Sequence, residues 1–120
     1  MNNISYNIIK LENINFKELK ELYLNNNNIS DIEVLGKVKF ENLEILDLGG
    51  NILNNISILE KVNFKELKEI DFSDNKISDI KILEQLKFEK LQKLDLSDNK
   101  IDWNNYSIII NNLESIDLIK

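Results

Sequence analysis

Carboxylate side chains recur at a constant spacing along the chain. Three aspartates, Asp47, Asp71 and Asp95, lie 24 residues apart. Neighbouring carboxylates can work as acid and base in glycoside hydrolysis, ligate Ca²⁺ or attract a cationic partner. Acid catalysis needs a raised pKa inside a pocket, and the known calcium loops place their ligands much closer together in sequence. We therefore expect binding without catalysis, and we expect no metal and no cofactor.

The composition removes other chemistries. The chain has 120 residues without cysteine or histidine, and all 15 basic residues are lysines. Thiol nucleophiles, imidazole bases and guanidinium clamps are therefore excluded. The formal net charge of -6 opposes nucleic-acid binding, so we expect no such partner. With no membrane-length apolar run and no signal peptide, we expect no membrane association and a cytoplasmic location. A surface or secreted location is the alternative if the chain is a fragment of a larger protein.

Four asparagines indicate the elements that must position these carboxylates. Each closes the pattern L-x-x-L-x-L-x-x-N-x-L, and the four are Asn27, Asn51, Asn75 and Asn99. Leucines that alternate with polar residues predict a strand with one buried face. Apolar residues three apart, which follow each asparagine, predict a short helix or 3₁₀ turn. Stacked asparagine amides are expected to form a buried hydrogen-bonded ladder with the main chain.

This repeated motif resembles that of leucine-rich-repeat proteins. Each unit continues as I-x-x-L-x-x-V-x-F, for example Ile32, Leu35, Val38 and Phe40, and is similar to the phosphatase-regulatory-subunit and internalin type stretched by two residues. The resemblance covers nearly the whole chain. It implies an α/β solenoid with a curved parallel sheet on the concave side and short helices or 3₁₀ turns on the convex side. It also implies protein binding as the usual activity.

The repeat predicts a single domain over residues 1–120 with two unlike ends. We expect an N-terminal half-repeat cap at 1–18, repeats at 19–42, 43–66, 67–90 and 91–112, and a terminal strand at 113–120. Leu91 and Leu113 are 22 residues apart, so Asp117 is expected beside Asp95 in the last strand. Trp103 is expected to be buried against the last coil, and an exposed binding residue is the alternative.

The outward positions of the predicted strands form the candidate binding face. They carry an excess of acidic residues that accounts for the whole net charge. The candidate partner-binding residues are Glu21, Tyr23, Asn25, Ile45, Asp47, Glu69, Asp71, Lys93, Asp95 and Asp117. Tyr23 and Ile45, beside space opened by Gly49 and Gly50, are predicted to form an apolar patch rimmed by acid. Such a composition is typical of an interface centre.

Two functions are compatible with this pattern. The first is a non-catalytic protein–protein interaction module whose acidic concave face binds a partner with a basic segment. The alternative is a structural spacer, or a fragment of a longer surface or scaffold protein, in which the acidic stripe is only repeated sequence. The near identity of the third and fourth repeats favours that alternative. The edge of the last strand is expected to be bare, which allows a monomer or an end-to-end dimer through this edge.

Overall fold

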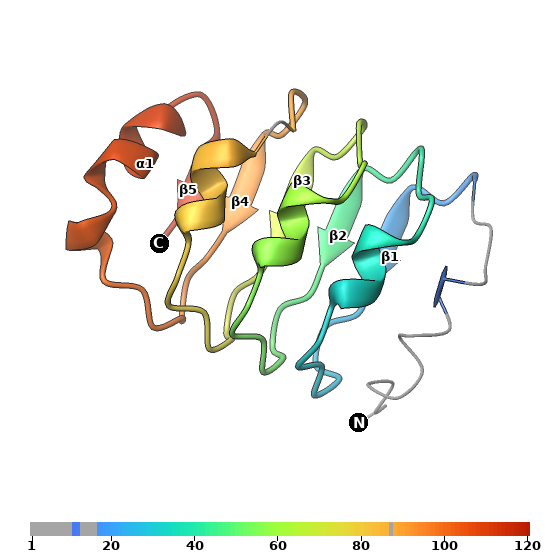
Figure 1. Cartoon of the computed structure of the whole chain (residues 1–120), viewed down its shortest axis with the longest axis horizontal. Helices are drawn as coiled ribbons and strands as arrows, with labels where there is room; N and C mark the ends of the chain where they lie inside the picture. Colours follow the sequence, from blue (N-terminus) through green and yellow to red (C-terminus); the bar gives the residue numbers. More distant parts are fainter. Residues whose placement is uncertain (1–10, 13–16, 87) are drawn as a thin grey trace.

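Five short parallel strands form a sheet along one side of the molecule. We describe residues 11–12, 17–86 and 88–120 in a computed structural model (Figure 1). The strands follow chain order across the sheet. They are β1 (Glu21–Tyr23), β2 (Ile45–Asp47), β3 (Glu69–Asp71), β4 (Lys93–Asp95) and β5 (Asp117–Ile119). Each strand pairs with the next 24 residues later, which makes every repeat one turn of a coil.

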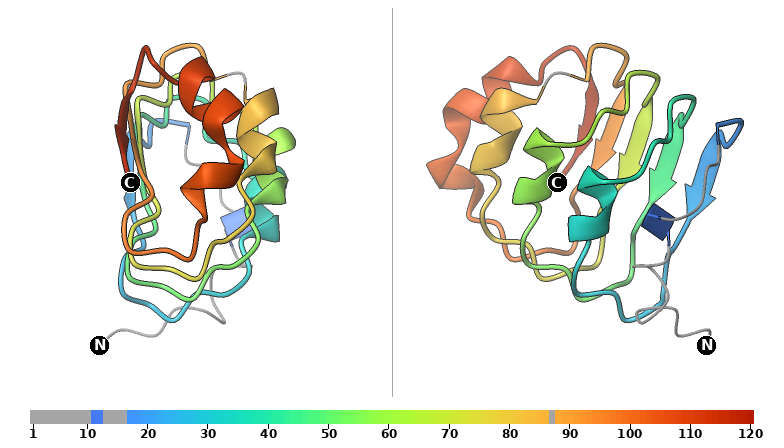
Figure 2. Two further views of the ribbon diagram at one scale, coloured as in Figure 1. Left: turned by 90° about the vertical axis from the view of Figure 1, so that its left-hand side faces the viewer. Right: turned by 45° about the vertical axis from the view of Figure 1, so that its right-hand side comes forward.

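Helical turns form the opposite side of the coil (Figure 2). The 3₁₀ helices are η2 (Glu33–Gly36), η3 (Ser57–Glu60), η4 (Lys81–Gln85) and η5 (Trp103–Asn105), and one α-helix, α1 (Ser107–Asn112), follows them. This arrangement confirms the predicted α/β solenoid, with its sheet on the concave side. We refer below to the exposed side of the sheet as the concave face.

The core lies between the sheet and the helical turns. The middle residue of each central strand, namely Leu46, Ile70 and Leu94, is almost completely buried because strand side chains alternate between the two faces. Phe40 and Phe64 stack with ring centroids 6.1 Å apart. One coil cannot bury its apolar face alone, so the stability of the molecule depends on the stacking of neighbouring coils.

The predicted asparagine ladder is confirmed. Asn51 Oδ1 accepts hydrogen bonds from the amides of Asn27 and Ile29 in the preceding coil, at 3.0 and 2.9 Å. Its Nδ2 donates to the carbonyl oxygens of Leu24 and Leu48 at 3.0 and 2.8 Å. Asn75 and Asn99 make the two equivalent Nδ2 bonds one and two coils later, and their Oδ1 atoms accept the Leu53 and Ile77 amides. The asparagines therefore satisfy main-chain groups that the bend would otherwise leave unpaired.

A left-handed residue precedes each ladder asparagine and turns the chain out of the strand. These residues are Asn26, Gly50, Asp74 and Asp98, with φ of 58°, 65°, 52° and 55°. Asparagine and aspartate tolerate this conformation better than other residues with a Cβ atom. The turn therefore needs no glycine in three of the four coils.

The last strand pairs in a different register from the one predicted. The pairs across β4 and β5 are Lys93–Asp117, Leu94–Leu118 and Asp95–Ile119. The prediction that Asp117 lies beside Asp95 is therefore wrong. A shift of two residues keeps every side chain on the same face, so the alternating pattern does not distinguish the two registers. The final coil contains α1, and Leu113 and Ile116 lie before the strand instead of on it.

The two ends of the coil differ from its centre. Of the predicted cap, Ile8, Ile14 and Phe16 lie outside the described residues, whereas Leu11 is half-buried and packs against the core. Trp103 is also only half-buried, and Lys120 Nζ lies 5.6 Å from its ring centre. In the described ranges we find no helix with the length and apolarity needed to cross a membrane.

Candidate functional site

Two rows of side chains run across the concave face. The first residues of the five strands form one row, Glu21, Ile45, Glu69, Lys93 and Asp117. The third residues form the other, Tyr23, Asp47, Asp71, Asp95 and Ile119. Neighbouring strands in a sheet lie about 4.8 Å apart, so side chains within a row are close neighbours. We call Asp47, Asp71 and Asp95 the aspartate row.

The aspartate row has a local structural role that the sequence analysis missed. Oδ1 of each aspartate accepts a hydrogen bond from the amide two residues later, in Gly49, Ser73 and Ser97, at 2.9, 2.8 and 3.0 Å. Asp95 Oδ1 also accepts from Ser97 Oγ at 2.7 Å. These bonds hold the turn at the end of each strand. Each aspartate is followed two residues later by a glycine or a serine, and this sequence pattern could have indicated the turn bonds.

The environment of Asp47 is unfavourable for its negative charge. Partial desolvation raises the pKa of Asp47 above its ordinary value, the Gly49 amide opposes this rise, and the neighbouring charge of Asp71 adds to it. Like charges that face each other across strands destabilise a sheet. A cation that binds over the aspartate row would relieve this repulsion.

Tyr23 lies next to Asp47 at the β1 end of the aspartate row. Its side chain is 56% exposed, and its hydroxyl donates to Glu21 Oε2 at 3.3 Å. Desolvation raises the pKa of Tyr23, and the charges of Glu21, Asp47 and Glu69 raise it further. The ring therefore offers an apolar surface within an acidic environment.

A depression of about 110 Å³ gathers most of the predicted binding residues. It is lined by Tyr23, Ile45, Leu46, Asp47, Glu69, Ile70, Asp71, Lys93 and Asp95. Glu21 adjoins this site through its bond to Tyr23. Asn25 and Asp117 are not among the lining residues. The predicted apolar patch of Tyr23 and Ile45 therefore opens into the depression, and the aspartate row forms one side of it.

The glycine pair does not open the space that the sequence suggested. A Cβ atom on Gly49 would lie 3.1 Å from Ser73 Oγ and 3.2 Å from Asp71 Oδ1. A Cβ atom on Gly50 would collide with the side-chain amide of Asn26. Neighbouring polar side chains already fill both places. The glycines therefore permit close packing of the turns and add no surface to the depression.

The strand and turn positions that the sequence assigns to the concave face hold more acidic than basic residues. After the register correction, its acidic side chains are Glu21, Glu44, Asp47, Glu69, Asp71, Asp74, Asp95, Asp98 and Asp117, and its lysines are Lys20, Lys68 and Lys93. Together these nine acidic residues and three lysines carry a formal charge of -6, which equals the formal net charge of the chain. One ion pair, between Lys68 and Glu44 at 3.5 Å, neutralises part of the face.

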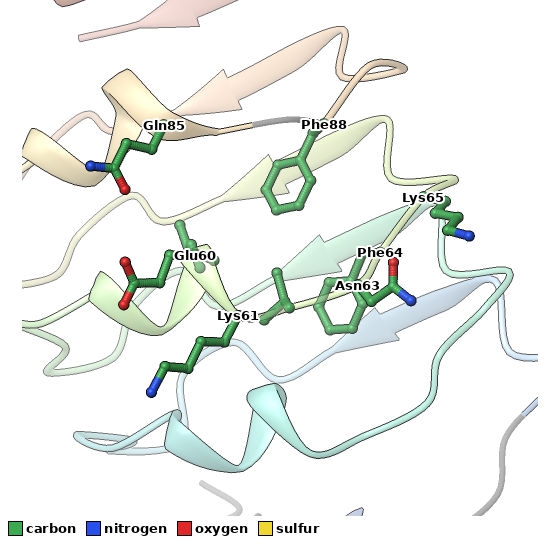
Figure 3. A pocket seen from close by; sticks show the side chains of 9 residues that line it. Glu60, Lys61, Asn63, Phe64, Lys65, Gln85 and Phe88 are labelled. Atoms are coloured by element: carbon green, nitrogen blue, oxygen red, sulfur yellow. The ribbon is translucent and has the colours of Figure 1, made fainter.

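Larger hollows lie on the convex side between η3 and η4. One of about 650 Å³ has Phe64 and Phe88 on one side and Glu60, Lys61 and Gln85 on the other (Figure 3). A second, of about 790 Å³, shares Glu60 and Gln85 with the first. The repeat pattern did not indicate these hollows. At the corresponding place between η2 and η3, Ile58 packs against Gly36. The residue 24 positions after Gly36 is Glu60, and this difference between the repeats was the sequence signal that could have indicated the hollows.

The hollows of the convex side carry charges of both signs. Glu60 and Glu84 lie there together with Lys61 and Lys81. Within the described residues, no group of three or more acidic side chains is arranged to hold a metal ion. We therefore place the candidate site on the concave face, where four acidic side chains and Lys93 surround an apolar centre.

Comparisons with solved structures agree with this architecture. An internalin C2 from Listeria monocytogenes is similar, with a TM-score of 0.68 and 30% identity over 87% of this chain and 42% of that chain. An internalin (inlF) from the same species has a TM-score of 0.61 and 23% identity over 93% of this chain and 37% of that chain, a likeness that concerns the fold alone. The chain therefore spans less than half the length of either structure.

Sequence comparison identifies the family. No curated protein matches the chain. The family model described as "Leucine Rich repeats (2 copies)" matches residues 17–61 and 65–120. These two ranges contain all five strands. The protein thus belongs to the leucine-rich-repeat family.

Proposed function

We propose that this protein is a non-catalytic module that binds another protein through its concave face. Leucine-rich-repeat domains generally mediate protein–protein interaction. The observation that carries the proposal for this chain is the depression in which the exposed Tyr23 and the half-buried Ile45 meet the aspartate row. An apolar centre with a polar rim is the usual composition of a binding interface.

The charge of the face supports a partner with a basic segment. The pKa of Asp47 is raised first by its partial desolvation and then by the neighbouring charge of Asp71, and a cationic partner would favour the charged form. A partner lysine placed over Asp47 and Asp71 would rest its aliphatic stem on Ile45 and its ammonium group near the carboxylates. Tyr23 would add a cation–π contact. Such a complex would form faster at low ionic strength, because the acidic face attracts the partner before contact.

The geometry gives little support to catalysis at the aspartate row. Substrate pockets usually measure about 300–1,000 Å³ and surround most of their ligand. The depression on the concave face holds about 110 Å³. Each aspartate also uses Oδ1 to hold its own turn, which ties the carboxylate to a structural contact.

One observation favours the alternative of a structural spacer. The turn bonds to Gly49, Ser73 and Ser97 are sufficient to explain why aspartate recurs at this position. Under this alternative the acidic stripe follows from the repeat and no dedicated partner exists.

The two functions can be separated with variants that change charge but preserve the turns. We would immobilise the wild-type protein and the Asp47→Asn, Asp71→Asn, Asp95→Asn triple variant, and compare the proteins captured from a lysate of the source organism. Asparagine keeps a side-chain oxygen that can accept the turn bond. We expect a stoichiometric partner that is lost from the variant and weakened by added salt.

The matched control removes three other aspartates. Asp31, Asp79 and Asp102 are exposed and also accept an amide two residues later, but they lie in the turns that lead to the helical side. The Asp31→Asn, Asp79→Asn, Asp102→Asn variant should retain the partner. Equal capture by both triple variants would place the site elsewhere, and no partner for any bait would favour the spacer.

We also propose a test of self-association through β5, as part of the same functional question. Leu118 and Ile119 are half-buried, and β5 is the last strand of the sheet in the part of the chain that we describe. An unpaired strand edge can pair with another chain. Sedimentation velocity of the wild type and of Leu118→Lys would decide this: a dimer lost in the variant supports pairing at β5, and a monomer at all concentrations opposes it.

A further inference from the structure

The convex hollows exist because η3 and η4 pack less closely than η2 and η3. A Cβ atom on Gly36 would lie 2.8 Å from Ile58 Cδ1, so η2 approaches η3 closely because residue 36 has no side chain. The equivalent residue of η3 is Glu60, which carries a long side chain. Ile82, the equivalent of the buried Ile58, is half-buried and lines the second hollow. The replacement of glycine by glutamate therefore accounts for open space between η3 and η4.

The chain also leaves η4 along a different path. After η2 and η3 come Lys37 and Lys61, whose amides donate to the carbonyl oxygen three residues earlier. Helix η4 is one residue longer and is followed by Leu86, whose backbone is extended with φ of -66° and ψ of 131°. Phe88 is then half-buried, whereas its equivalent Phe64 is almost completely buried. The chain after η4 thus leaves apolar surface uncovered.

Apolar side chains form the floor of the first hollow. They are Leu59, Val62, Phe64 and Phe88. Val62 is half-buried, whereas Val38, which occupies the same position in the preceding coil, is buried. With a volume of about 650 Å³, this hollow has room for a large apolar side chain (Figure 3). Such a side chain would bind favourably because it removes the apolar floor from water.

Acidic side chains adjoin this apolar floor. Glu60 and Gln85 line both hollows and therefore join them into one groove. In Figure 3 these two side chains lie at the end opposite Phe64 and Phe88. The charged residues of the second hollow are Glu60, Asp79, Glu84 and Lys81, so acids exceed bases there. In the part of the chain that we describe, the ion pairs include none of these three acids.

Two lysines border the first hollow, Lys61 and Lys65. In Figure 3 both side chains extend away from Phe88. The acids at the other end of the groove are therefore expected to select the charge of an occupant.

We propose that this convex groove, formed by the residues that line the two hollows, binds an extended segment of a partner protein. The segment carries an aromatic or large aliphatic side chain and, within a few residues of it, a lysine or arginine. The apolar side chain covers Val62 and Phe88, and the basic group lies beside Glu60 and Glu84. Small-molecule sites surround most of their ligand, whereas two joined hollows along the surface match an extended chain.

The convex groove is separate from the concave face. The sheet and the helical turns lie on opposite sides of the coil (Figure 2). One copy of the protein therefore has room for a second segment on its convex side while the concave face is occupied. Two segments of one partner that bound both places would reinforce each other through their effective concentration.

The test is an NMR titration of the labelled Asp47→Asn, Asp71→Asn, Asp95→Asn variant, whose concave face lacks the charges of the aspartate row. The probe is a capped peptide with the order Phe, Leu, Ser, Lys, Lys. A second peptide has the reverse order, because the groove could accept either chain direction. We expect the signals of Val62, Phe64, Glu84 and Gln85 to shift together and to saturate with at least one of the two peptides.

Two control peptides separate the contributions of the anchor and the charge. Replacing Phe and Leu with serine should weaken binding about tenfold or more, because the apolar floor then stays in water. Replacing both lysines with glutamine should weaken it about threefold to tenfold, the range expected for two exposed charge pairs. Unchanged affinity of either control peptide would overturn the proposal.

A pair of matched protein variants tests the same groove from the other side. Glu60→Gln, Glu84→Gln, made in the same triple variant, should weaken binding of the lysine peptide about threefold to tenfold. Both positions are exposed, so the fold should be preserved. The control is Glu33→Gln, Glu41→Gln, which changes two exposed glutamates that line neither hollow and should leave the affinity unchanged.

Each outcome decides the proposal. Shifts confined to the strands, no shifts with either peptide, or equal affinity of the two double variants would overturn it. None of these results bears on the concave face, whose binding is measured separately in the wild-type protein.

Discussion

Asp47 combines a stabilising contact with an unfavourable charge. Its Oδ1 accepts the Gly49 amide at 2.9 Å, while desolvation and the charge of Asp71 raise its pKa above the ordinary value of 3.8. A carboxyl group whose pKa is higher in the folded state binds its proton more tightly there. Its contribution to stability is therefore fully present at low pH and is lost as pH rises through the folded-state pKa.

The first prediction is that Asp47→Asn stabilises the protein at pH 7. Asparagine keeps the oxygen that accepts the Gly49 amide and removes the repulsion from Asp71. The gain should be a few tenths of a kcal/mol because solvent screens much of the charge. Urea unfolding at pH 7 and pH 3 measures it: the variant should be more stable at pH 7, and the difference should shrink at pH 3. A variant less stable than the wild type at pH 7 would contradict this account.

The second prediction concerns the ladder asparagines. Asn75→Ala should cost about 3 kcal/mol, because it leaves the buried Leu53 amide without its acceptor and removes one of the two amide donors from each of the Leu48 and Phe72 carbonyl oxygens. Asn99→Ala should cost less, because Asn99 is half-buried and water can replace part of its bonding. The free energies of unfolding of the two variants provide the comparison. Equal losses of unfolding free energy in the two variants would indicate that the burial of the asparagine does not determine the cost of removing it.

At the scale of elements, the 24-residue period was enough to predict the strands and the ladder. Leu46, Ile70 and Leu94 are buried as the alternation requires, and Asn51, Asn75 and Asn99 bond as predicted. The register of β5 could not be predicted, because a two-residue shift preserves the buried face and α1 changes the path of the last coil. The turn bonds of the aspartates and the filled space at the glycines depend on local geometry that a repeat pattern does not specify.

The third prediction tests the register of β5. Lys93 lies beside Asp117, so the two charges should attract each other across the strands by about 0.2–1 kcal/mol. A double-mutant cycle with Lys93→Met and Asp117→Asn measures this coupling energy. A matching cycle with Asp95→Asn and Asp117→Asn should give a weaker interaction. Purely additive effects of Lys93→Met and Asp117→Asn would contradict the register.

At the scale of the whole molecule, the proposed acidic face is the side of the coil that the sheet forms. The excess of acid over base there equals the formal charge of -6, while the ion pairs Lys37–Glu12 and Lys90–Glu66 lie away from the strands. Self-repulsion of one face opposes folding and at the same time attracts cationic partners. The same feature thus links a stability cost to the proposed binding function.

The fourth prediction follows from this unequal distribution of charge. Moderate salt should raise the thermal midpoint of the wild type, because it screens repulsion within the concave face. The Asp47→Asn, Asp71→Asn, Asp95→Asn variant should respond less to salt than the Asp31→Asn, Asp79→Asn, Asp102→Asn variant. Calorimetry at two salt concentrations provides the midpoints. If salt raised the thermal midpoints of the two variants equally, the repulsion that salt screens would not lie on the concave face.

The most direct test of the central claim is an NMR titration of the labelled protein with a peptide of alternating lysine and leucine. The account predicts that Tyr23, Ile45, Asp47 and Asp71 shift together and saturate, and that added salt reverses the shifts. A matched glutamate–leucine peptide should cause none. Shifts confined to the convex side, or none at any peptide concentration, would contradict binding of a basic segment at the concave face.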